Sequence, residues 1–304
     1  MASILTKAAL GLVVLAAAGG AVFWAVTAPK PLPETAFADL GAPDLKNGEH
    51  LFWAGGCISC HAAKGAGDKG DLTLSGGEPL NTPFGTFHPP NISPDETAGI
   101  GGWSLAAFGN AMLRGVDDEN QHLYPSFPYG SYAHMNVKDI NDLYGFLKTL
   151  PKSANQAPAH ELNFPFGFRR LLGGWKFLYF TDQPRVTLAS TDDRVKRGQY
   201  LVEGPGHCGE CHTPRDALGG FKTGMWLAGG PNPEGKGKIP NITPGGDIGK
   251  WTEEDIVSYL ETGMTPEFDS VGGTMVEVQK NMAKLPAEDR VAIAAYLKAI
   301  PAVQ

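Results

Sequence analysis

The five-residue pattern C-x-x-C-H occurs twice in this chain and uses every cysteine that the chain has. The copies consist of Cys57, Cys60 and His61, and of Cys208, Cys211 and His212. Because all four cysteines belong to these copies, none is left for a structural disulfide or for a catalytic thiol. The fold must therefore be built around two such segments, which lie 151 residues apart.

The pattern is typical of the attachment site of a c-type haem. Two thiols three positions apart reach the two vinyl groups of one porphyrin, and the adjacent imidazole becomes the proximal ligand of the iron. A redox-active dithiol does not need the histidine, and a zinc site would have to combine ligands from two distant segments. The sequence therefore predicts two covalently bound haem c groups, one at each copy.

The remainder of the chain is duplicated as well. Each copy of the pattern is followed by an Asn-Ile-Ser/Thr-Pro turn, a tryptophan and a closing proline. The landmarks are Asn91, Trp103, Gly115, Asp139 and Pro151 in the first repeat, and Asn241, Trp251, Gly263, Asp289 and Pro301 in the second. The tryptophan and glycine are 12 residues apart in both repeats, and so are the aspartate and proline. This shared spacing indicates two homologous modules. Pro89-Pro90 and Pro240 flank the two Asn-Ile turns, and we expect this backbone to hydrogen-bond or pack around either the proximal histidines or the haem propionates.

The apolar residues follow a helical period, and no convincing alternating strand pattern is present. We expect helices at residues 47–55, 104–114, 137–150, 192–203, 252–262 and 286–300. The sequence therefore predicts an all-α fold with two tandem cytochrome c-like domains and long loops, at residues 44–151 and 191–304. The chain of 304 residues is long enough for both.

Residues 1–43 read as a membrane segment followed by a tether. Residues 8–28 carry no charge and follow Lys7, so they can span a bilayer with the N-terminus in the cytoplasm. A cleaved secretory signal is the alternative, with Val26-Thr27-Ala28 as the cleavage site. We favour a retained transmembrane helix because the apolar run is long. Both interpretations place the haem domains on the periplasmic side of a bacterial cytoplasmic membrane, where haem is attached covalently.

Residues 152–190 connect the modules and are rich in aromatic side chains between Phe164 and Phe180. We favour packing of these aromatics between the two modules. The alternative is an exposed patch for a partner or for the membrane surface. The formal charge of −7 argues against nucleic acid as a partner.

A haem that carries electrons usually has a sixth ligand opposite its histidine, and methionine is the usual choice. Met275 lies 24 residues after Trp251, and we predict it as this ligand for the second haem. Met282 is its competitor, although a methionine near a helix is more often a packing residue.

The corresponding position in the first repeat is Phe127, which cannot bind iron. We therefore predict Met135, in the loop before the last helix, as the sixth ligand of the first haem. His134 is the main alternative and would give a haem of lower potential. His122 is a more distant candidate, which we interpret as an exposed loop residue.

Over residues 45–302 the chain resembles the cytochrome c subunits of bacterial membrane-bound dehydrogenases, such as the alcohol, gluconate and aldehyde dehydrogenase complexes. The matching strings are Thr82-Pro83-Phe84-Gly85, residues 90–95, 99–104, 123–129 and 206–215, and Gly272-Gly273-Thr274-Met275. Members of this family typically have three haem modules and a C-terminal membrane attachment, whereas this chain has two modules and an N-terminal apolar segment. The family also has methionine where this chain has Phe127.

The resemblance implies a non-catalytic subunit that conducts electrons. A partner dehydrogenase subunit would oxidise its substrate outside the cytoplasm, and the electrons would pass to quinone, a soluble cytochrome c or an oxidase. Two other functions stay open. One is a free-standing, membrane-tethered carrier that serves a terminal oxidase or reductase, and the other is a dihaem enzyme such as a peroxidase. A Gly-rich dinucleotide fingerprint is not found in the sequence.

Overall fold

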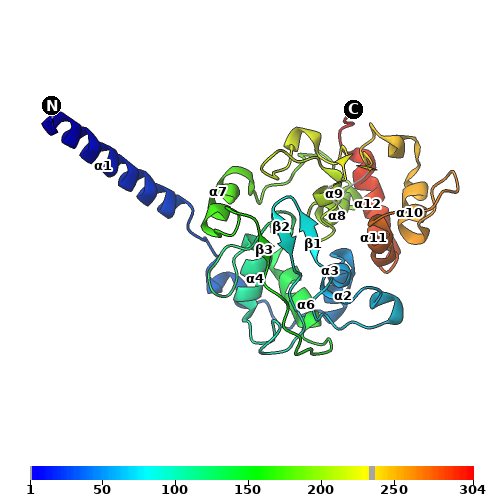
Figure 1. Ribbon diagram of the computed structural model, residues 1–304. Helices are drawn as coiled ribbons and strands as arrows, with labels where there is room; N and C mark the ends of the chain where they lie inside the picture. Colours follow the sequence, from blue (N-terminus) through cyan, green and yellow to red (C-terminus); the bar gives the residue numbers. More distant parts are fainter. Residues whose placement is uncertain (1, 233–236) are drawn as a thin grey trace.

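The computed structural model describes residues 2–232 and 237–304 (Figure 1). Its first helix, α1 (Ala2–Val26), projects away from a rounded body that contains the other labelled elements. The stretch Thr6–Val26 has a mean hydropathy of 2.2, and no residue in it is buried. Within the described residues, α1 is the one helix that is long and apolar enough to cross a bilayer.

The body is mostly helical, as the sequence predicts. The first module contains η1 (Glu34–Phe37), α2 (Leu45–Ala54), α3 (Cys57–His61), η2 (Gly67–Lys69), α4 (Leu105–Arg114), α5 (Tyr129–Tyr132) and α6 (Val137–Leu147). The second contains α8 (Asp193–Glu203), α9 (Gly209–His212), η3 (Thr223–Met225), η4 (Asp247–Lys250), α10 (Glu253–Thr262), α11 (Met275–Met282) and α12 (Ala287–Ala299). The predicted helices appear as α2, α4, α6, α8, α10 and α12.

A few short strands accompany the helices and were not expected from the sequence. β1 (Leu80–Thr82), β2 (Gly85–Phe87) and β3 (Glu161–Leu162) form an antiparallel sheet, and β4 (Gly230–Pro231) pairs with β5 (Lys238–Ile239). Strands of two or three residues are too short for an alternating pattern to appear in the sequence. Their pairing holds loops together, and the fold remains mostly helical.

The same helix crossing occurs in both modules. A Cβ atom on Gly48 of α2 would lie 2.1 Å from the backbone oxygen of Asp142 in α6. A Cβ atom on Gly198 of α8 would lie 1.9 Å from the backbone oxygen of Ala292 in α12. Only glycine allows two helices to approach this closely. Gly198 lies 150 positions after Gly48, and Ala292 lies 150 positions after Asp142. The two crossings therefore use equivalent residues, so the modules are repeats in space as well as in sequence.

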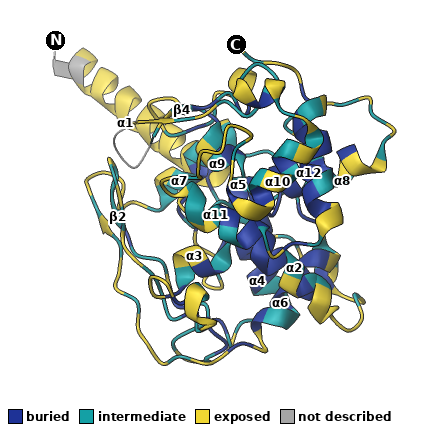
Figure 2. Ribbon diagram, turned by 90° about the vertical axis from the view of Figure 1, so that its right-hand side faces the viewer, coloured by how far each residue is buried: buried dark blue, intermediate teal, exposed yellow. Residues whose placement is uncertain are grey.

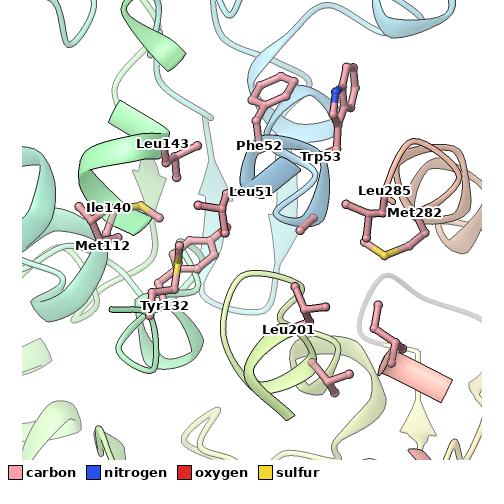
Figure 3. Close-up of a cluster of buried hydrophobic side chains, with 14 of the residues drawn as sticks. Leu51, Phe52, Trp53, Met112, Tyr132, Ile140, Leu143, Leu201, Met282 and Leu285 are labelled. Atoms are coloured by element: carbon pink, nitrogen blue, oxygen red, sulfur yellow. The ribbon is translucent and has the colours of Figure 1, made fainter. Parts of the chain in front are cut away.

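The buried side chains of the two modules form one continuous core (Figure 2). Leu51 and Trp53 come from α2, whereas Leu201 comes from α8 and Met282 from α11, with Leu285 just beyond it. Figure 3 shows these side chains on neighbouring helices of both modules, with Leu51 and Leu201 between them. The modules are therefore packed face to face and not merely linked.

The connection between the modules fulfils our expectation of packed aromatics only in part. Trp175 and Phe180 pack against the Tyr129 ring of the first module, and Tyr179 donates to Asp216 of the second. Other aromatics of the connection are exposed. Phe164 and Phe177 are 86% and 74% exposed, and Phe168 is exposed as well. The physical reason is that residues 164–180 pass over the outside of the body, where α7 (Arg170–Tyr179) packs beside the end of α1 (Figure 1). Only one side of α7 contacts the modules, as in the hydrogen bond from Trp175 Nε1 to Leu218 O at 3.0 Å.

Candidate functional site

Each C-x-x-C-H segment forms about one helical turn directly after a longer helix. In the first module, α3 follows α2 across Gly56, which has a φ of 54°. In the second, α9 follows α8 across His207, which has a φ of 37° although it is not a glycine. These left-handed residues turn the chain so that a short helix can start in a new direction. A helical turn then brings thiols three positions apart to one side, as attachment of one porphyrin requires.

The two histidines are held in the same way. His61 Nδ1 lies 2.9 Å from the backbone oxygen of Pro90, and His212 Nδ1 lies 2.9 Å from that of Pro240. Because a carbonyl oxygen only accepts hydrogen bonds, Nδ1 is the donor, and Nε2 keeps the lone pair that can bind iron. The expected contact between these prolines and the histidines is confirmed.

The turns that carry these carbonyl groups are fixed by the asparagines of the repeat. The Asn91 side-chain amide donates to the backbone oxygens of Ser153 at 2.7 Å and Asn155 at 2.9 Å. The Asn241 amide donates to Val303 O at 2.8 Å in the second module. Each asparagine therefore ties its turn to the segment after the last helix of its own module, which positions the proline that orients the histidine.

The surroundings of the motifs favour neutral side chains. Burial raises the pKa of the Cys57 and Cys208 thiols to about 12, so they stay protonated near neutral pH. Burial also lowers the pKa of His61 and His212, although their contacts with proline oxygens oppose this effect. A neutral imidazole is the form that binds iron, whereas a redox dithiol needs a lowered thiol pKa. The environment therefore fits haem attachment better than a redox dithiol.

The donor set does not favour zinc. Within the described residues, no group of three or more histidine, cysteine, aspartate or glutamate side chains is placed to hold a metal ion. The second cysteine of each motif, Cys60 or Cys211, is exposed, and the histidines are half-buried. These side chains are accessible from outside, as attachment of a large porphyrin requires. The residues at both motifs therefore fit a covalently bound haem.

The structure places the candidates for the sixth ligand of the first haem in different surroundings. Met135 is 5% exposed and follows α5, and it belongs with Tyr132 to the buried cluster against which Cys57 packs. His134 is half-buried, with Nδ1 2.9 Å from Ser131 O and Nε2 2.9 Å from Gln183 O, so both ring nitrogens face carbonyl oxygens. Met135 therefore remains the better candidate.

His122 corrects one expectation. It is buried and not exposed, and its Nε2 lies 2.8 Å from the backbone oxygen of Thr27 at the end of α1. The residue packs beneath the first helix, which explains its burial. A histidine whose Nε2 is engaged with this distant segment is a poor candidate for iron ligation.

In the second module, Met275 is half-buried at the start of α11, whereas Met282 at its end is buried in the core beside Leu285 (Figure 3). The offset of 150 residues pairs Met135 with Leu285 and Met282 with Tyr132. The two modules therefore carry methionine at different positions of the repeat. This difference leaves Met275 as our prediction, with Met282 as a packing residue.

The two motif segments contact each other across the modules. His207 Nε2 lies 3.1 Å from the backbone oxygen of Gly55, and the amide of Asn281 donates to the hydroxyl of Ser59 at 2.8 Å. The hydroxyl of Ser131 donates to the Glu210 carboxylate at 2.7 Å. The sequence analysis did not identify these residues, although they occupy equivalent positions of the repeat. Asn281 lies 150 positions after Ser131, and Glu210 lies 151 positions after Ser59. The two motifs thus lie side by side in a nearly symmetric arrangement.

Comparisons with known proteins agree with this geometry. The family model described as Cytochrome c matches residues 45–151, which include the first motif. A protein of Cereibacter sphaeroides described as "Diheme cytochrome c-type" is 51% identical over 295 residues, and the match covers 97% of this chain and 98% of that protein. The similarity therefore extends over both modules and the N-terminal region.

Longer relatives are subunits of dehydrogenases. The gluconate 2-dehydrogenase cytochrome c subunit of Pantoea cypripedii is 35% identical over 88% of this chain and 62% of its own length. The fructose dehydrogenase cytochrome subunit of Gluconobacter japonicus is also 35% identical, over 86% of this chain and 53% of its length. The chain thus spans a little more than half of each of these subunits.

Proposed function

The chain belongs to the dihaem c-type cytochromes, and from this premise we propose that it is the electron-transfer subunit of a membrane-bound dehydrogenase complex. It has two covalently bound haem c groups. When bound, the iron of each haem alternates between its ferric and ferrous states and so carries one electron. The chain's own contribution is to hold these two groups close together and in fixed orientations.

The residues that hold each haem can be named. Cys57, Cys60 and His61 hold the first, and Cys208, Cys211 and His212 hold the second. We assign the sixth ligands to Met135 and Met275. A methionine ligand raises the reduction potential relative to a second histidine, which suits a carrier that accepts electrons from a dehydrogenase.

One observation supports electron transfer between the two sites more than any other. The residues that precede the two motifs are in contact, with His207 Nε2 3.1 Å from Gly55 O. A protein that needed its haems for independent reactions would not require the segments before their attachment helices to touch. Contact between these segments favours a short electron path through both modules.

We assign a dehydrogenase subunit as the partner of this chain. This subunit and both haem modules lie on the periplasmic side of the bacterial cytoplasmic membrane. α1 anchors the chain in this membrane, and electrons leave to quinone, a soluble cytochrome c or an oxidase. The apolar stretch Thr6–Val26 supports the anchor, and the two dehydrogenase relatives support the partner.

The test is purification of the full chain from native membranes through a C-terminal tag. We expect a larger dehydrogenase subunit to co-purify, and its substrate to reduce both haems in the complex. The separated chain should not be reduced by that substrate. A chain that purifies alone and is reduced directly by quinol would instead be a free-standing carrier.

A further inference from the structure

The connection between the modules exposes an unusual amount of apolar surface. We call this surface the aromatic patch, and it consists of Phe164, Phe168, Leu171, Phe177 and Leu178. The rings of Phe164 and Phe168 are 6.0 Å apart, so the first two members form a cluster. Together with Phe166, the patch gives six exposed large apolar side chains within 15 residues, although a water-exposed segment of this length would normally be polar.

The exposed members of α7 lie on one side of that helix. Leu171 and Leu178 are seven residues apart and therefore about two turns apart on the same face. Phe177 lies beside the glycines Gly173 and Gly174 on the adjoining part of the surface. On the opposite side, Lys176 donates to the backbone oxygens of Arg114 and Gly115 at 2.7 and 2.6 Å. Trp175 and Tyr179 flank the stripe and donate to Leu218 O and to the Asp216 carboxylate of the second module. The helix therefore presents an apolar stripe to its surroundings and a packed side to the protein.

This stripe is continuous with the end of the candidate membrane helix. A Cβ atom on Gly173 would lie 2.2 Å from the backbone oxygen of Thr27, so α7 and the end of α1 are in direct contact. The guanidinium group of Arg170 lies 4.1 Å from the centre of the Trp24 ring, and it also donates to the Trp24 backbone oxygen. The aromatic patch thus begins where the apolar helix enters the body.

We propose that the aromatic patch is a second membrane contact, which lies in the headgroup region of the lipid bilayer beside α1. The inference rests on the membrane anchor assigned above. Its support is the contact between α7 and α1, because a helix that leaves a bilayer at Thr27 brings the adjoining stripe to the same depth. Aromatic side chains near arginine are typical of this interface, where rings enter the apolar boundary and guanidinium groups meet phosphates.

A second contact would fix the orientation of the haem modules relative to the membrane. One helix alone lets the body rotate and tilt about residues near Thr27. α7 is a ten-residue helix held against the body by Trp175, so its contact with lipid would define one face of the body as membrane-facing. Both modules would then be presented to partners in one orientation.

The test places a photoreactive benzoylphenylalanine at single positions of the full haem-loaded chain in vesicles of phosphatidylethanolamine and phosphatidylglycerol. The test positions are Phe164 and Phe177. Leu15, which is exposed within α1, reports the anchor. The negative control is Phe268, which is 87% exposed in the loop between α10 and α11, on the far side of the body from α1 (Figure 1). An unchanged haem spectrum shows that each variant is folded.

After illumination, mass spectrometry identifies what each probe has bound. We expect lipid adducts from Leu15, Phe164 and Phe177, with yields at least tenfold above that from Phe268. Adducts from Leu15 without adducts from Phe164 and Phe177 would overturn the second contact and leave the anchor intact. The second contact would also be overturned if the patch cross-linked to another protein chain and not to lipid. An absence of lipid adducts at Leu15 would refute the anchor itself.

Discussion

The side-chain amide of Asn281 donates a hydrogen bond of 2.8 Å to the hydroxyl of Ser59, although the two residues are 222 positions apart. Ser59 lies between the two cysteines of the first motif, and Asn281 lies in α11 of the second module. The equivalent contact in the other direction joins Ser131 of the first module to Glu210 of the second motif. Each module therefore holds the attachment helix of the other.

The Ser59–Asn281 contact can be tested with a double-mutant cycle. Ser59→Ala and Asn281→Ala should each lower the free energy of unfolding, and the coupling between them should be about 1 kcal/mol, the typical net value of a neutral hydrogen bond. Chemical denaturation of the haem-loaded protein measures this. The matched control is the neighbouring Lys280–Asp68 ion pair, whose side chains are both exposed. A cycle of Lys280→Ala and Asp68→Ala should give less coupling, because exposed pairs contribute little. Equal coupling in both cycles would contradict the importance of the Ser59 contact.

The helix crossing in the second module predicts a strong effect of one added methyl group. Gly198→Ala should lower the free energy of unfolding by about 3 kcal/mol, because the new Cβ would overlap a backbone oxygen that cannot move alone. Gly167→Ala is the control, since no heavy atom would lie within 4 Å of its new Cβ. Denaturant midpoints compare the two variants, and similar midpoints would show that α8 and α12 do not pack as described.

Much of this fold could be predicted because it is repeated. The spacing of Trp103 to Gly115 and of Trp251 to Gly263 identifies equivalent helices, and the structure ends both with a left-handed glycine. The face-to-face packing of the modules could not be predicted, because its apolar residues, such as Leu51 and Leu201, look like the core of a single module, and its polar residues, such as Ser59 and Asn281, look like surface residues.

The assignment of Met135 predicts a specific spectral change. Met135→Ala should remove the sixth ligand of one haem, so the oxidised protein should show one high-spin signal by electron paramagnetic resonance, with the other haem unchanged. His134→Ala should leave both haems low-spin, because both ring nitrogens of His134 face carbonyl oxygens. The opposite result, with His134→Ala changing the spectrum and Met135→Ala not, would make His134 the ligand.

The corresponding prediction for the second haem uses two methionines of α11. Met275→Ala should convert this haem to the high-spin form. Met282→Ala should instead lower the free energy of unfolding by about 2–5 kcal/mol and keep both haems low-spin, because Met282 is buried in the core. A high-spin signal in Met282→Ala with none in Met275→Ala would reverse this assignment.

Asp142 should make part of the stability of the first module depend on acid pH. Burial opposes its ionisation, but the side chains of Asn47 and Lys138 and the backbone N–H of Asp44 bind the carboxylate and lower its pKa. A lowered carboxyl pKa contributes stability above the ordinary value near 4, and this contribution is lost as the pH falls through the folded value. Asp142→Asn should therefore be less stable at pH 7 and less sensitive to acid below pH 4.

Unfolding followed by far-ultraviolet circular dichroism from pH 3 to pH 7 measures this effect. Asp193→Asn is the control, since the Asp193 side chain is 96% exposed. This variant should keep the acid sensitivity of the parent chain. If Asp142→Asn and Asp193→Asn had the same pH profile, the contacts of Asp142 would not contribute as described.

In the candidate site, the motif residues could be predicted from the sequence, whereas the sixth ligands could not. The motif residues follow from local spacing, because thiols and imidazole must lie within one helical turn. The sixth ligand is brought from elsewhere by the fold, and the repeat does not locate it since Phe127 and Leu285 interrupt the pattern. The packing of the aromatic connection is predicted only in part. Trp175 and Tyr179 contact the modules, whereas Phe164 and Phe177 are exposed because residues 164–180 pass over the outside of the body.

The most direct test of this account is the intact mass of the denatured, purified chain, compared with that of Cys57→Ala/Cys60→Ala. We expect a parent mass equal to the polypeptide plus two covalently bound haem groups, and a variant that retains one. A parent chain that carries a single haem or none after denaturation would contradict it.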